Sequence, residues 1–551
     1  MSKFIFVVGG VMSSVGKGVT SASIAKILKS RGYKVTNVKC DMYINIDAGT
    51  IRPTEHGEVF VGEDGIEADQ DLGNYERFTG NTMASVNYIT TGQVYQEVIK
   101  KERNLEYKGE DVEVVPDIPN EIIRRLKLAA KKDKAEITVV EYGGTVGEYQ
   151  VLLFLEAARM MRRQYPGDVQ VVLVSYLPVP SHIGEMKTKP TQHAARTLNE
   201  AGLQADFIVA RGPHELDKPR RERLGTFCNV DDGHSISAPD VESIYEVPLI
   251  LEKGGMSTKI LKRFGLKPKK KNMQQWKALV RRIKKVDTEL NIAIVGKYFG
   301  TGEFTLADSY ISVIEAIKHA CWANGRKPKL TWVNSENFEK DPKSVKELSK
   351  YGGIIVPGGF GERGIEGIIS AIKYARIKNI PYFGLCYGMQ LACVEFARNV
   401  LGLKNANSVE VDEKTDNPII HANPMQAKNI IEKKYGATMR LGAYDCVLRE
   451  KSKAFKAYGK KKVSERHRHR YEFNDAYREA LEENGLQIVG VNPTSGLVEI
   501  VELKDHPFFI GVQFHPEFKS EPLNPHPLFK AFAAAAVRVG KKEGKVARKR
   551  K

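Results

Sequence analysis

The stretch KFIFVVGGVMSSVGKGVTSASIAKIL, residues 3–28, decides the fold of the amino-terminal half. Its first seven residues are apolar and β-prone, which predicts a buried strand, and the apolar segment from residue 20 onward predicts a helix. A run of glycines and serines that includes Lys17 lies between them. Backbone N–H groups of such a loop, the positive end of a helix and a lysine together suit phosphate. The sequence therefore predicts a nucleotide site after the first strand.

This loop is not a regular Walker A motif. Five residues, rather than four, separate Gly10 from Gly16, and Gly18 stands where Ser or Thr usually follows the lysine. An ordinary glycine turn before a helix is the alternative. The serines and Lys17, placed between a first strand and an apolar helix, favour a P-loop-like phosphate site.

The same alternation continues outward from this stretch. Between the expected strands lie amphipathic segments, which predicts a parallel sheet with helices on both faces. We expect those strands at residues 3–9, 33–39, 135–142, 169–177 and 205–211. A second alternating pattern begins near residue 289. The sequence predicts two doubly wound α/β domains, residues 1–266 and 291–537, with a linker at 267–290 and a basic, disordered tail at 538–551.

The composition favours a globular protein over a membrane protein or a disulfide-rich protein. The 551 residues are 42% hydrophobic and 28% charged, as in soluble globular proteins, and no apolar run approaches the roughly 18 residues of a membrane span. Six cysteines without paired spacing fit a reducing cytoplasm. The net charge of +18 suits a polyanionic partner, and both nucleic acid and nucleoside triphosphates qualify.

Two acidic residues are candidate metal ligands beside the phosphate loop. Glu141 ends an expected strand and is followed by two glycines, and Asp71 lies in the acidic stretch EADQDLGNYERF. Carboxylates at strand ends commonly hold Mg²⁺ beside phosphates. For Asp71 a solvated loop acid is the alternative. The loop KTKPTQH, residues 187–193, offers two lysines to a second polyanion, with a plain surface loop as the alternative.

Cys386 is a candidate nucleophile in the second half. GLCYG, residues 384–388, fits the strand–turn–helix elbow in which glycines flank a nucleophile. The helix N-terminus favours a thiolate, and FHPEF supplies His515 as a base and Glu517 to orient it. PGGFGERG, residues 357–364, offers backbone N–H groups for an oxyanion. We expect Cys393, inside the following helix, to be a core residue.

The segment ERHRHRYEF, residues 465–473, is dense in arginine and histidine. A metal site is disfavoured because neighbouring arginines repel a cation. A carboxylate-binding arginine and a basic surface strand remain as two interpretations.

Over roughly residues 1–537 the chain resembles the CTP synthase family. The amino half carries the synthetase-domain motifs GGVMSSVGKG, CDMYINIDAGT, EHGEVFVGEDG, DLGNYERF, EYGGTVGE and GEMKTKPTQH. The carboxy half is similar to class I glutamine amidotransferases through PGGFGERG, GLCYGMQ and FHPEF. The resemblance implies a P-loop-like synthetase domain followed by a class I glutamine amidotransferase domain.

The resemblance also implies an activity. The enzyme would aminate UTP to CTP, the last step of de novo CTP synthesis, through a 4-phosphorylated UTP intermediate. It would use ATP, Mg²⁺ and ammonia released from glutamine. GTP would activate it and CTP would inhibit it. A cytoplasmic homotetramer, a dimer of dimers with possible filaments, is implied, and neither a membrane nor nucleic acid is expected as a partner.

Residue roles follow from the same resemblance. The implied glutaminase triad is Cys386, His515 and Glu517, and the implied Mg²⁺ ligands are Asp71 and Glu141. The implied ATP contacts are Ser14, Val15, Gly16, Lys17, Gly18, Val19, Asp71, Asp240 and Val241. The implied UTP or CTP contacts are Ser13, Glu148, Tyr149, Gln150, Lys187, Thr188, Lys189, Pro190, Thr191, Gln192 and Arg223. The implied glutamine contacts are Gly359, Tyr387, Gly388, Met389, Gln390, Glu410 and Arg470, and the implied ammonia passage is lined by Pro53, His56 and Val59.

The chain departs from the family pattern at several of these positions. Arg223 stands where a lysine is common, and an arginine keeps the charge but changes the geometry. Glu148, Tyr149 and Gln150 replace a frequent Asp-Ile-Glu, which bears on how strongly CTP inhibits. Tyr387 replaces a more frequent leucine and leaves the triad unaffected.

Two other functions are compatible with parts of the sequence. The amidotransferase half would also serve another acceptor, such as that of a cobyrinate-type amidase, although KTKPTQH and the Asp71 segment favour a nucleotide. A catalytically silent assembly or nucleic-acid-binding protein would explain the basic tail, but the intact Cys386, His515 and Glu517 argue against it.

Overall fold

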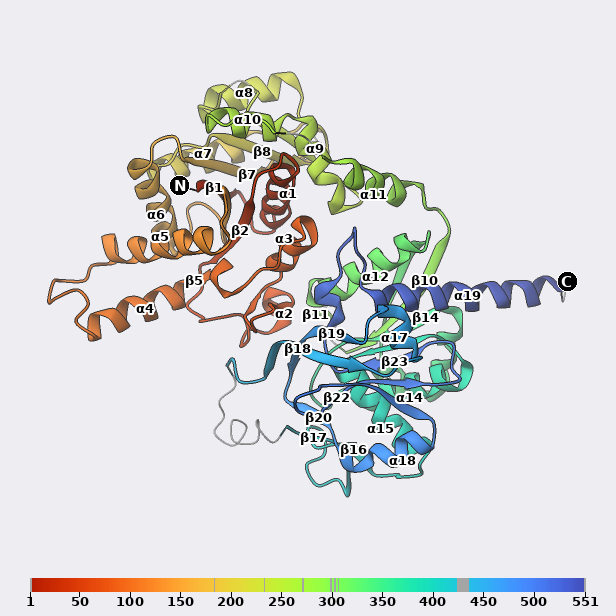
Figure 1. Cartoon of the computed structure of the whole chain (residues 1–551). Helices are drawn as coiled ribbons and strands as arrows, with labels where there is room; N and C mark the ends of the chain where they lie inside the picture. Colours follow the sequence, from red (N-terminus) through yellow and green to blue (C-terminus); the bar gives the residue numbers. More distant parts are fainter. Residues whose placement is uncertain are drawn as a thin grey trace. The chain divides into compact units, whose positions relative to one another are not determined.

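The computed structural model describes residues 2–182, 184–231, 233–269, 272–297, 300–301, 304–305, 307–423 and 436–549. The chain divides into two compact units (Figure 1). Unit 1 comprises Met1–Ala48 and Asp71–Val280, and unit 2 comprises Gly49–Gln70 and Arg281–Lys551.

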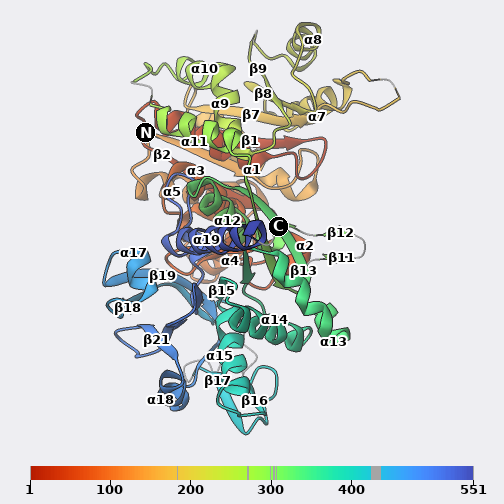
Figure 2. The ribbon, with the colours of Figure 1, turned by 90° about the vertical axis from the view of Figure 1, so that its right-hand side faces the viewer.

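Unit 1 is built on a seven-stranded sheet in which every pair of neighbours is parallel, in the order β5-β2-β6-β1-β7-β8-β9. Figure 2 shows β1, β7 and β8 side by side in this sheet. The strands are β1 (Lys3–Gly10), β2 (Val35–Asp41), β5 (Tyr88–Thr90), β6 (Ile137–Tyr142), β7 (Val169–Tyr176), β8 (Phe207–Gly212) and β9 (Ser235–Pro239). Their continuous apolar runs are typical of parallel strands buried on both faces.

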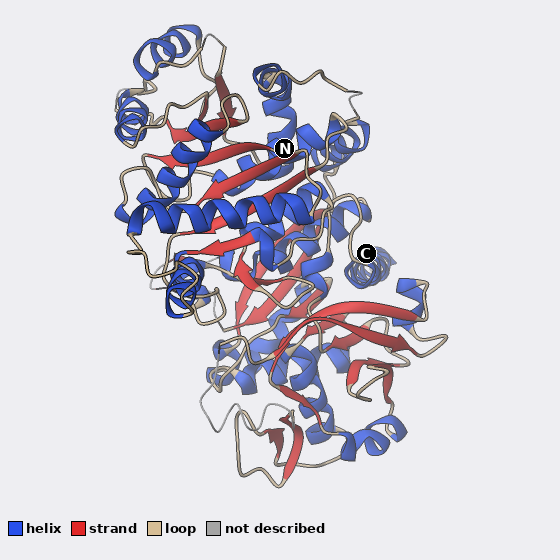
Figure 3. Ribbon diagram, turned by 60° about the vertical axis from the view of Figure 1, so that its left-hand side comes forward, coloured by secondary structure: helices blue, strands red, loops and turns tan. Residues whose placement is uncertain are grey.

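Helices cover both faces of this sheet, as the sequence predicts (Figure 3). Phe4, Phe6 and Val8 of β1 pack in one core with Ile122 and Phe154. The helices are α1 (Lys17–Ser30), α3 (Asp71–Thr79), α4 (Thr91–Arg103), α5 (Val114–Lys132), α6 (Leu152–Gln164), α7 (Lys189–Glu200), α8 (Lys218–Cys228), α9 (Val247–Lys253), α10 (Met256–Arg263) and α11 (Gln274–Lys285). The doubly wound prediction for this half is confirmed.

Unit 2 has a nine-stranded mixed sheet in the order β13-β10-β14-β15-β23-β22-β21-β18-β19. The first five strands are parallel to one another and the remaining pairs are antiparallel. The strands are β10 (Glu289–Gly296), β13 (Lys327–Asn334), β14 (Gly353–Val356), β15 (Tyr382–Leu385), β18 (Arg440–Leu448), β19 (Lys462–His469), β21 (Leu486–Val491), β22 (Val498–Leu503) and β23 (Phe509–Val512). The predicted parallel strands are therefore present, and the antiparallel extension was not anticipated.

Helices of unit 2 pack against this sheet, and three short strand pairings complete the unit. The helices are α12 (Ile311–Ala323), α13 (Glu336–Lys340), α14 (Ile365–Lys378), α15 (Tyr387–Asn399), α17 (Lys453–Tyr458), α18 (Arg478–Glu483) and α19 (Pro527–Lys549). The small sheets are β3 (Val59–Val61) with β4 (Glu67–Asp69), β11 (Gly300–Thr301) with β12 (Phe304–Thr305), and β16 (Ala406–Ser408), β17 (Asn417–Ala422) and β20 (Tyr471–Phe473).

One expectation from the sequence, and one of the two interpretations of ERHRHRYEF, are wrong. The tail expected to be disordered from residue 538 continues helix α19 to Lys549, because alanine, lysine and arginine are good helix formers. ERHRHRYEF does not form a basic surface strand: Arg466, His467 and His469 of β19 are buried. Among the described residues, no helix combines the length and apolar character needed to cross a membrane.

Residues 49–70 interrupt the predicted first domain. They belong to unit 2 although unit 1 resumes at Asp71. Glu58 fixes this segment: the Ser312 backbone N–H, in the first turn of α12, donates to its carboxylate at 3.1 Å, and the Ser312 hydroxyl donates to the same oxygen. A carboxylate at a helix N-terminus satisfies N–H groups that have no partner within the helix and interacts favourably with the helix dipole. The continuous domain expected at 1–266 is thus split by a segment that folds elsewhere.

We expect Glu58→Ala to lower the free energy of unfolding of unit 2 by about 1–3 kcal/mol, because a buried helix-end N–H loses its carboxylate acceptor. Glu55→Ala, an exposed acid of the same segment, is the control and should change stability little. Chemical denaturation followed by fluorescence measures both. Equal stabilities of the two variants would contradict the role given to Glu58.

Candidate active sites

The predicted phosphate loop lies at the carboxyl end of the central strand of unit 1. β1 ends at Gly10 and α1 begins at Lys17, with Gly16 in the left-handed conformation at φ 90° directly before it. Lys17 is buried and its side chain folds back over Gly9, where a Cβ would lie 2.9 Å from Nζ. Burial lowers the pKa of Lys17, and nearby Glu141 opposes that shift. The strand–loop–helix arrangement is the one that phosphate-binding loops use.

Asp71 and Glu141 converge on one buried cation, Lys39 of β2. Lys39 Nζ donates to the Asp71 carboxylate and to Glu141 Oε1, the latter at 3.1 Å. Glu141 also accepts a hydrogen bond from the Tyr75 hydroxyl. Asp71 is therefore no solvated loop acid: it begins α3 and lies directly over the start of α1, where a Cβ on Gly18 would fall 1.8 Å from Asp71 Oδ1.

The electrostatics of this pair show what it can bind. Burial raises the pKa of Glu141 to about 7, and the neighbouring Asp71 carboxylate adds to the rise, while Lys39 opposes it. Two carboxylates that face the same position favour a cation bound between them. Mg²⁺ is typically held by one or two carboxylates together with substrate phosphates. The donor set therefore fits Mg²⁺, although the described residues contain no cluster of three or more His, Cys, Asp or Glu side chains arranged for a metal.

The predicted UTP loop lies beside the phosphate loop. Helix α7 begins at Lys189 and packs on the end of β1, where a Cβ on Gly10 would lie 2.6 Å from the Ala194 Cβ. Thr191 Oγ1 is 2.8 Å from Ser175 Oγ, and Gln192 Nε2 donates to Thr188 Oγ1 at 3.0 Å. These contacts bring Lys187, Thr188, Lys189, Pro190, Thr191 and Gln192 to the same end of the sheet as Ser13 through Val19.

The other residues predicted to bind UTP or CTP differ in their surroundings. Glu148 turns inward and accepts from the Thr145 backbone N–H at 2.8 Å. Tyr149 is 91% exposed and, with Gln150, lines a separate apolar cavity of about 130 Å³. Arg223 is exposed on α8.

Asp240, expected to contact ATP, is joined to the phosphate loop by a residue that the sequence analysis missed. Arg211 Nη2 donates to Asp240 Oδ1 at 3.0 Å, and its Nε is 3.5 Å from where a Gly16 Cβ would stand. Val241 follows Asp240 directly. Arg211 and Lys39 both lie on predicted strands. A charged residue in an otherwise β-prone strand was the feature of the sequence that could have indicated their place in the site.

Cys386 lies at the predicted elbow of unit 2. It follows β15 and precedes α15 with φ 48° and ψ −99°, a conformation that costs a non-glycine residue about 1–3 kcal/mol. Its backbone N–H donates to the Val512 carbonyl of β23 at 2.7 Å. Cys393 is fully buried in the helix, as expected. The strained turn presents the thiol at a helix N-terminus, where a thiolate is favoured.

His515 and Glu517 meet Cys386 as the sequence predicts. His515 Nδ1 is 2.7 Å from Glu517 Oε1. Gly358 lies against both partners, since a Cβ there would be 2.8 Å from His515 Cε1 and 3.8 Å from the Cys386 Cβ. Burial alone would lower the pKa of His515, but the Glu517 carboxylate and the Cys386 thiol raise it to about 10. An imidazolium beside a thiol is the arrangement of an activated cysteine.

A cavity of about 880 Å³ opens at this thiol. Of the predicted glutamine contacts, four line it: Gly359, Gln390, Glu410 and Arg470. Tyr387, Gly388 and Met389 are buried at the start of α15 and lie behind it; the Tyr387 hydroxyl donates to the Gly361 carbonyl at 2.9 Å. Gln513 directly follows β23 and donates to Cys386 Sγ at 3.6 Å; the sequence analysis missed this contact.

The cavity is also lined by residues 49–53, 58 and 59 of the amino half, among them Pro53 and Val59. His56 is instead 3.1 Å from Asp69 Oδ2. Two of the three residues expected along an ammonia passage therefore share one cavity with Cys386, within unit 2.

Two family models match this chain, one in each half of the sequence. The model of the CTP synthase N-terminus matches residues 3–266, and that of class I glutamine amidotransferases matches residues 305–535. CTP synthase of Picosynechococcus sp. is 48% identical over 537 residues, which cover 97% of this chain and 96% of that protein. CTP synthase of Caldanaerobacter subterraneus is 49% identical, with 97% and 98% covered. The solved glutaminase domain of Trypanosoma brucei CTPS with bound acivicin is 40% identical and covers 45% of this chain and 94% of its own, with a TM-score of 0.42.

We expect Gly18→Ala to weaken binding of ATP with Mg²⁺ by about tenfold or more, because the new Cβ displaces the Asp71 carboxylate. Isothermal titration calorimetry measures the change. Gly225→Ala in α8, where a Cβ meets only the Val230 carbonyl at 3.4 Å, is the matched control. Equal affinity in the two variants would remove Asp71 from the nucleotide site.

We expect Glu517→Gln to lower kcat for glutamine hydrolysis by about 10²- to 10⁴-fold and to move the alkaline limb of its pH profile to lower pH. The carboxylate raises the pKa of His515, so without it the imidazolium loses its proton at lower pH. Glu395→Gln, which removes another buried carboxylate of unit 2 paired with Arg376, should leave the limb in place. An unmoved limb in Glu517→Gln would contradict the assignment.

Proposed function

This chain belongs to the CTP synthase family, and we propose that its two units divide the amination of UTP to CTP between them. Unit 2 would release ammonia from glutamine, and unit 1 would bind ATP, UTP and Mg²⁺. The observation that carries this division is the meeting of Cys386, His515 and Glu517 in a cavity that residues of the amino half also line. The full-length likeness to curated CTP synthases favours this reading over another amide acceptor or a silent assembly protein.

In unit 2 the Cys386 thiolate would attack the side-chain amide carbon of glutamine. The C–N bond then breaks, and His515 passes its proton to the departing nitrogen, which leaves as ammonia. Water hydrolyses the resulting thioester, with His515 now accepting the proton of that water. Gly359 and its neighbouring backbone N–H groups would stabilise the oxyanion. Gln390, Glu410 and Arg470 would hold the amino-acid end of glutamine.

Ammonia must remain unprotonated to act as a nucleophile, which requires a path sheltered from water. Pro53 and Val59 lie in the same cavity as Cys386 and support such a path. His56 next to them is held by Asp69. We place the first part of the ammonia passage along these residues.

In unit 1 ATP would phosphorylate the 4-oxygen of UTP, and ammonia would then displace that phosphate from carbon 4. The loop of Ser14 through Val19 would bind the ATP phosphates, with Lys17 bridging their outer oxygens, and Asp240 would lie near the nucleoside. Asp71 and Glu141 would hold Mg²⁺, which neutralises phosphate charge when bound.

The segment from Lys187 to Gln192, with Ser13 and Arg223, would bind UTP, or CTP as an inhibitor. Glu148 already accepts hydrogen bonds from its own loop, and Gln150 cannot carry the negative charge of the frequent glutamate. We therefore propose CTP inhibition that differs in strength from the family pattern, together with activation by GTP.

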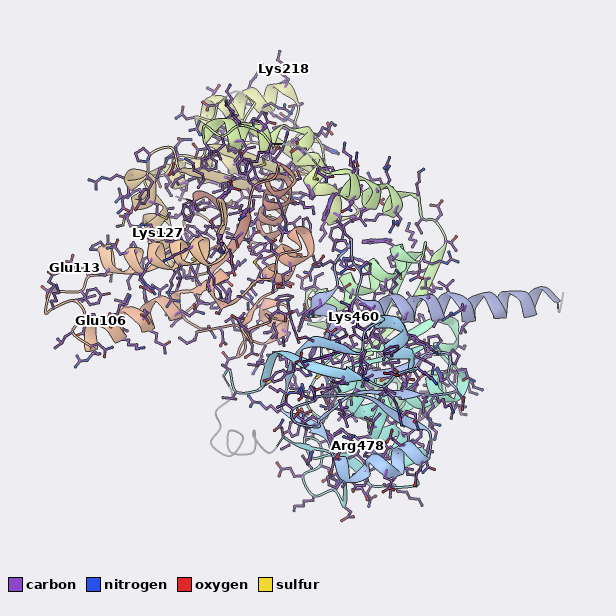
Figure 4. All side chains as sticks on the ribbon, viewed as in Figure 1. Glu106, Glu113, Lys127, Lys218, Lys460 and Arg478 are labelled. Atoms are coloured by element: carbon purple, nitrogen blue, oxygen red, sulfur yellow. The ribbon has the colours of Figure 1, made fainter. Side chains whose placement is uncertain are left out.

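Self-association is supported by apolar side chains left exposed in unit 1. These include Ile44, Ile99, Leu105, Val114, Leu128 and Tyr149. Helices α4 and α5 lie side by side and end near Glu106 and Glu113, labelled in Figure 4. Ile99 lies on α4 and Val114 and Leu128 lie on α5, so three of these side chains come from two helices that contact each other. We propose that these exposed side chains join copies of this chain in a homotetramer, and that the six free cysteines place the enzyme in a reducing cytoplasm.

The direct test is a product assay with UTP, ATP, Mg²⁺ and glutamine, followed by nucleotide chromatography. A CTP peak that requires all four components is expected. No CTP peak with or without GTP would reject the proposed function.

We expect Cys386→Ala to abolish glutamine-dependent CTP formation and to retain formation from added ammonia, because the thiol is needed only to release ammonia. Lys17→Ala should abolish both, since it removes a phosphate contact in unit 1. Cys393→Ala, seven residues along the same segment, is the control for altering a buried thiol. Loss of both activities in a folded Cys386→Ala enzyme would contradict the division into two sites.

A further inference from the structure

A stack of aromatic rings connects the amino half of the sequence to the catalytic imidazole. Phe60 of β3 is fully buried, and its ring centroid is 5.1 Å from that of Phe518 in an edge-to-face arrangement. The Phe518 ring in turn stacks on the His515 ring, with centroids 5.3 Å apart and an angle of 21° between the ring planes. Aromatic pairs of this kind have preferred geometries. The place of Phe60 therefore limits where the His515 ring can lie.

Strands β3 and β4 form a hairpin, residues 59–69, and strand β19 connects this hairpin to the backbone around Cys386 and His515. The Arg466 carbonyl of β19 accepts from the His515 backbone N–H at 2.7 Å, and the Arg468 carbonyl is 3.9 Å from Cys386 Sγ. Strand β19 thus holds the backbone of the base and faces the nucleophile.

The side chains of these two arginines reach back to the hairpin. Arg466 Nη1 donates to the Val61 carbonyl at 3.0 Å, and its guanidinium lies 5.3 Å from the Phe60 ring centroid. Arg468 Nε donates to Glu67 Oε1 at 2.8 Å. Glu63 of the hairpin also forms two ion pairs within unit 2, with Arg466 at 3.2 Å and with Lys519 at 3.0 Å.

We propose that Phe60 is a positioning residue for His515, acting through Phe518, so that glutamine hydrolysis depends on the hairpin of residues 59–69. The proposal rests on the proposed role of His515 as the base of the Cys386 site. Phe60 does not touch glutamine: Val59 lines the cavity, whereas Phe60 points away from it into the aromatic stack. Its effect would be on the angle and distance between imidazole and thiol.

The test compares Phe60→Leu with Phe532→Leu. Phe532 is an equally buried phenylalanine of unit 2 that packs on Phe383 and Phe508, away from the triad. Each variant loses one buried ring, so both report the general cost of that loss. Only Phe60→Leu changes the support of His515.

For Phe60→Leu we expect kcat for glutamine hydrolysis to fall about tenfold or more, with KM for glutamine changed far less, because small misplacements of a catalytic group are costly. The pH midpoint of Cys386 alkylation by iodoacetamide, followed by mass spectrometry, should move to higher pH, because a displaced imidazolium stabilises the thiolate less. CTP formation from added ammonia should stay at the unchanged level. Glu67→Gln, which keeps the shape but weakens the hold on Arg468, should shift both readouts less in the same direction.

Several outcomes would overturn the proposal. The same kcat and the same alkylation midpoint in Phe60→Leu and Phe532→Leu would make Phe60 an ordinary core residue. An equal fall in ammonia-dependent CTP formation would place its effect outside the triad. If Phe60→Leu does not fold, unchanged readouts in Glu67→Gln overturn it. Failure of the unaltered enzyme to hydrolyse glutamine would instead reject the proposed function itself.

Discussion

The carboxylate of Glu58 on the first turn of α12 is the interaction on which the organisation of this protein depends. It holds residues 49–70 in unit 2, although the residues on either side of them fold in unit 1. This segment supplies Pro53, Glu58 and Val59 to the lining of the cavity at Cys386, and it provides hydrogen-bond partners for Arg466 and Arg468 of β19. The Glu58 contact at the start of α12 thus acts together with the Arg466 and Arg468 contacts to hold residues 49–70 against the rest of unit 2.

Buried charges shape both sites, in different ways. In unit 1 the Lys39 ammonium lies between the Asp71 and Glu141 carboxylates. In unit 2 Arg440 donates to Glu499 at 2.6 Å, Glu499 is 2.7 Å from His467, and burial raises the pKa of nearby Glu472 to about 8. This cluster joins strands β18, β19 and β22 to Glu472 of β20. His469, Arg470 and Tyr471, which line the cavity, directly precede Glu472 in the chain. Buried ion clusters are costly unless every member is held, which favours one arrangement of those strands over its alternatives.

The sequence predicts what is local and fails where contacts are distant. The strand–loop–helix around Lys17, the elbow at Cys386 and the His515–Glu517 pair each lie within a few residues of one another, so their pattern is visible in a short stretch. Lys39 and Arg211 reach their site from predicted strands far apart along the chain, and Gln513 reaches Cys386 from the position directly after β23; the roles of all three were not predicted. The antiparallel strands β18 to β22 escaped because loops of irregular length separate them. Nothing in EHGEVFVGEDG indicates that its partners lie some 250 to 400 residues further on.

The path of the chain has a consequence for how these two activities are inherited. Three peptide connections join the units, after Ala48, after Gln70 and after Val280. A gene divided at the linker would leave the carboxy-terminal product without Glu58, Phe60 and the wall of its own cavity. The segment that lines part of the cavity at Cys386 is encoded inside the amino-terminal half, between α1 and Asp71. Fission of this gene therefore separates a catalyst from part of its scaffold, and the fused arrangement is the one that keeps both sites whole.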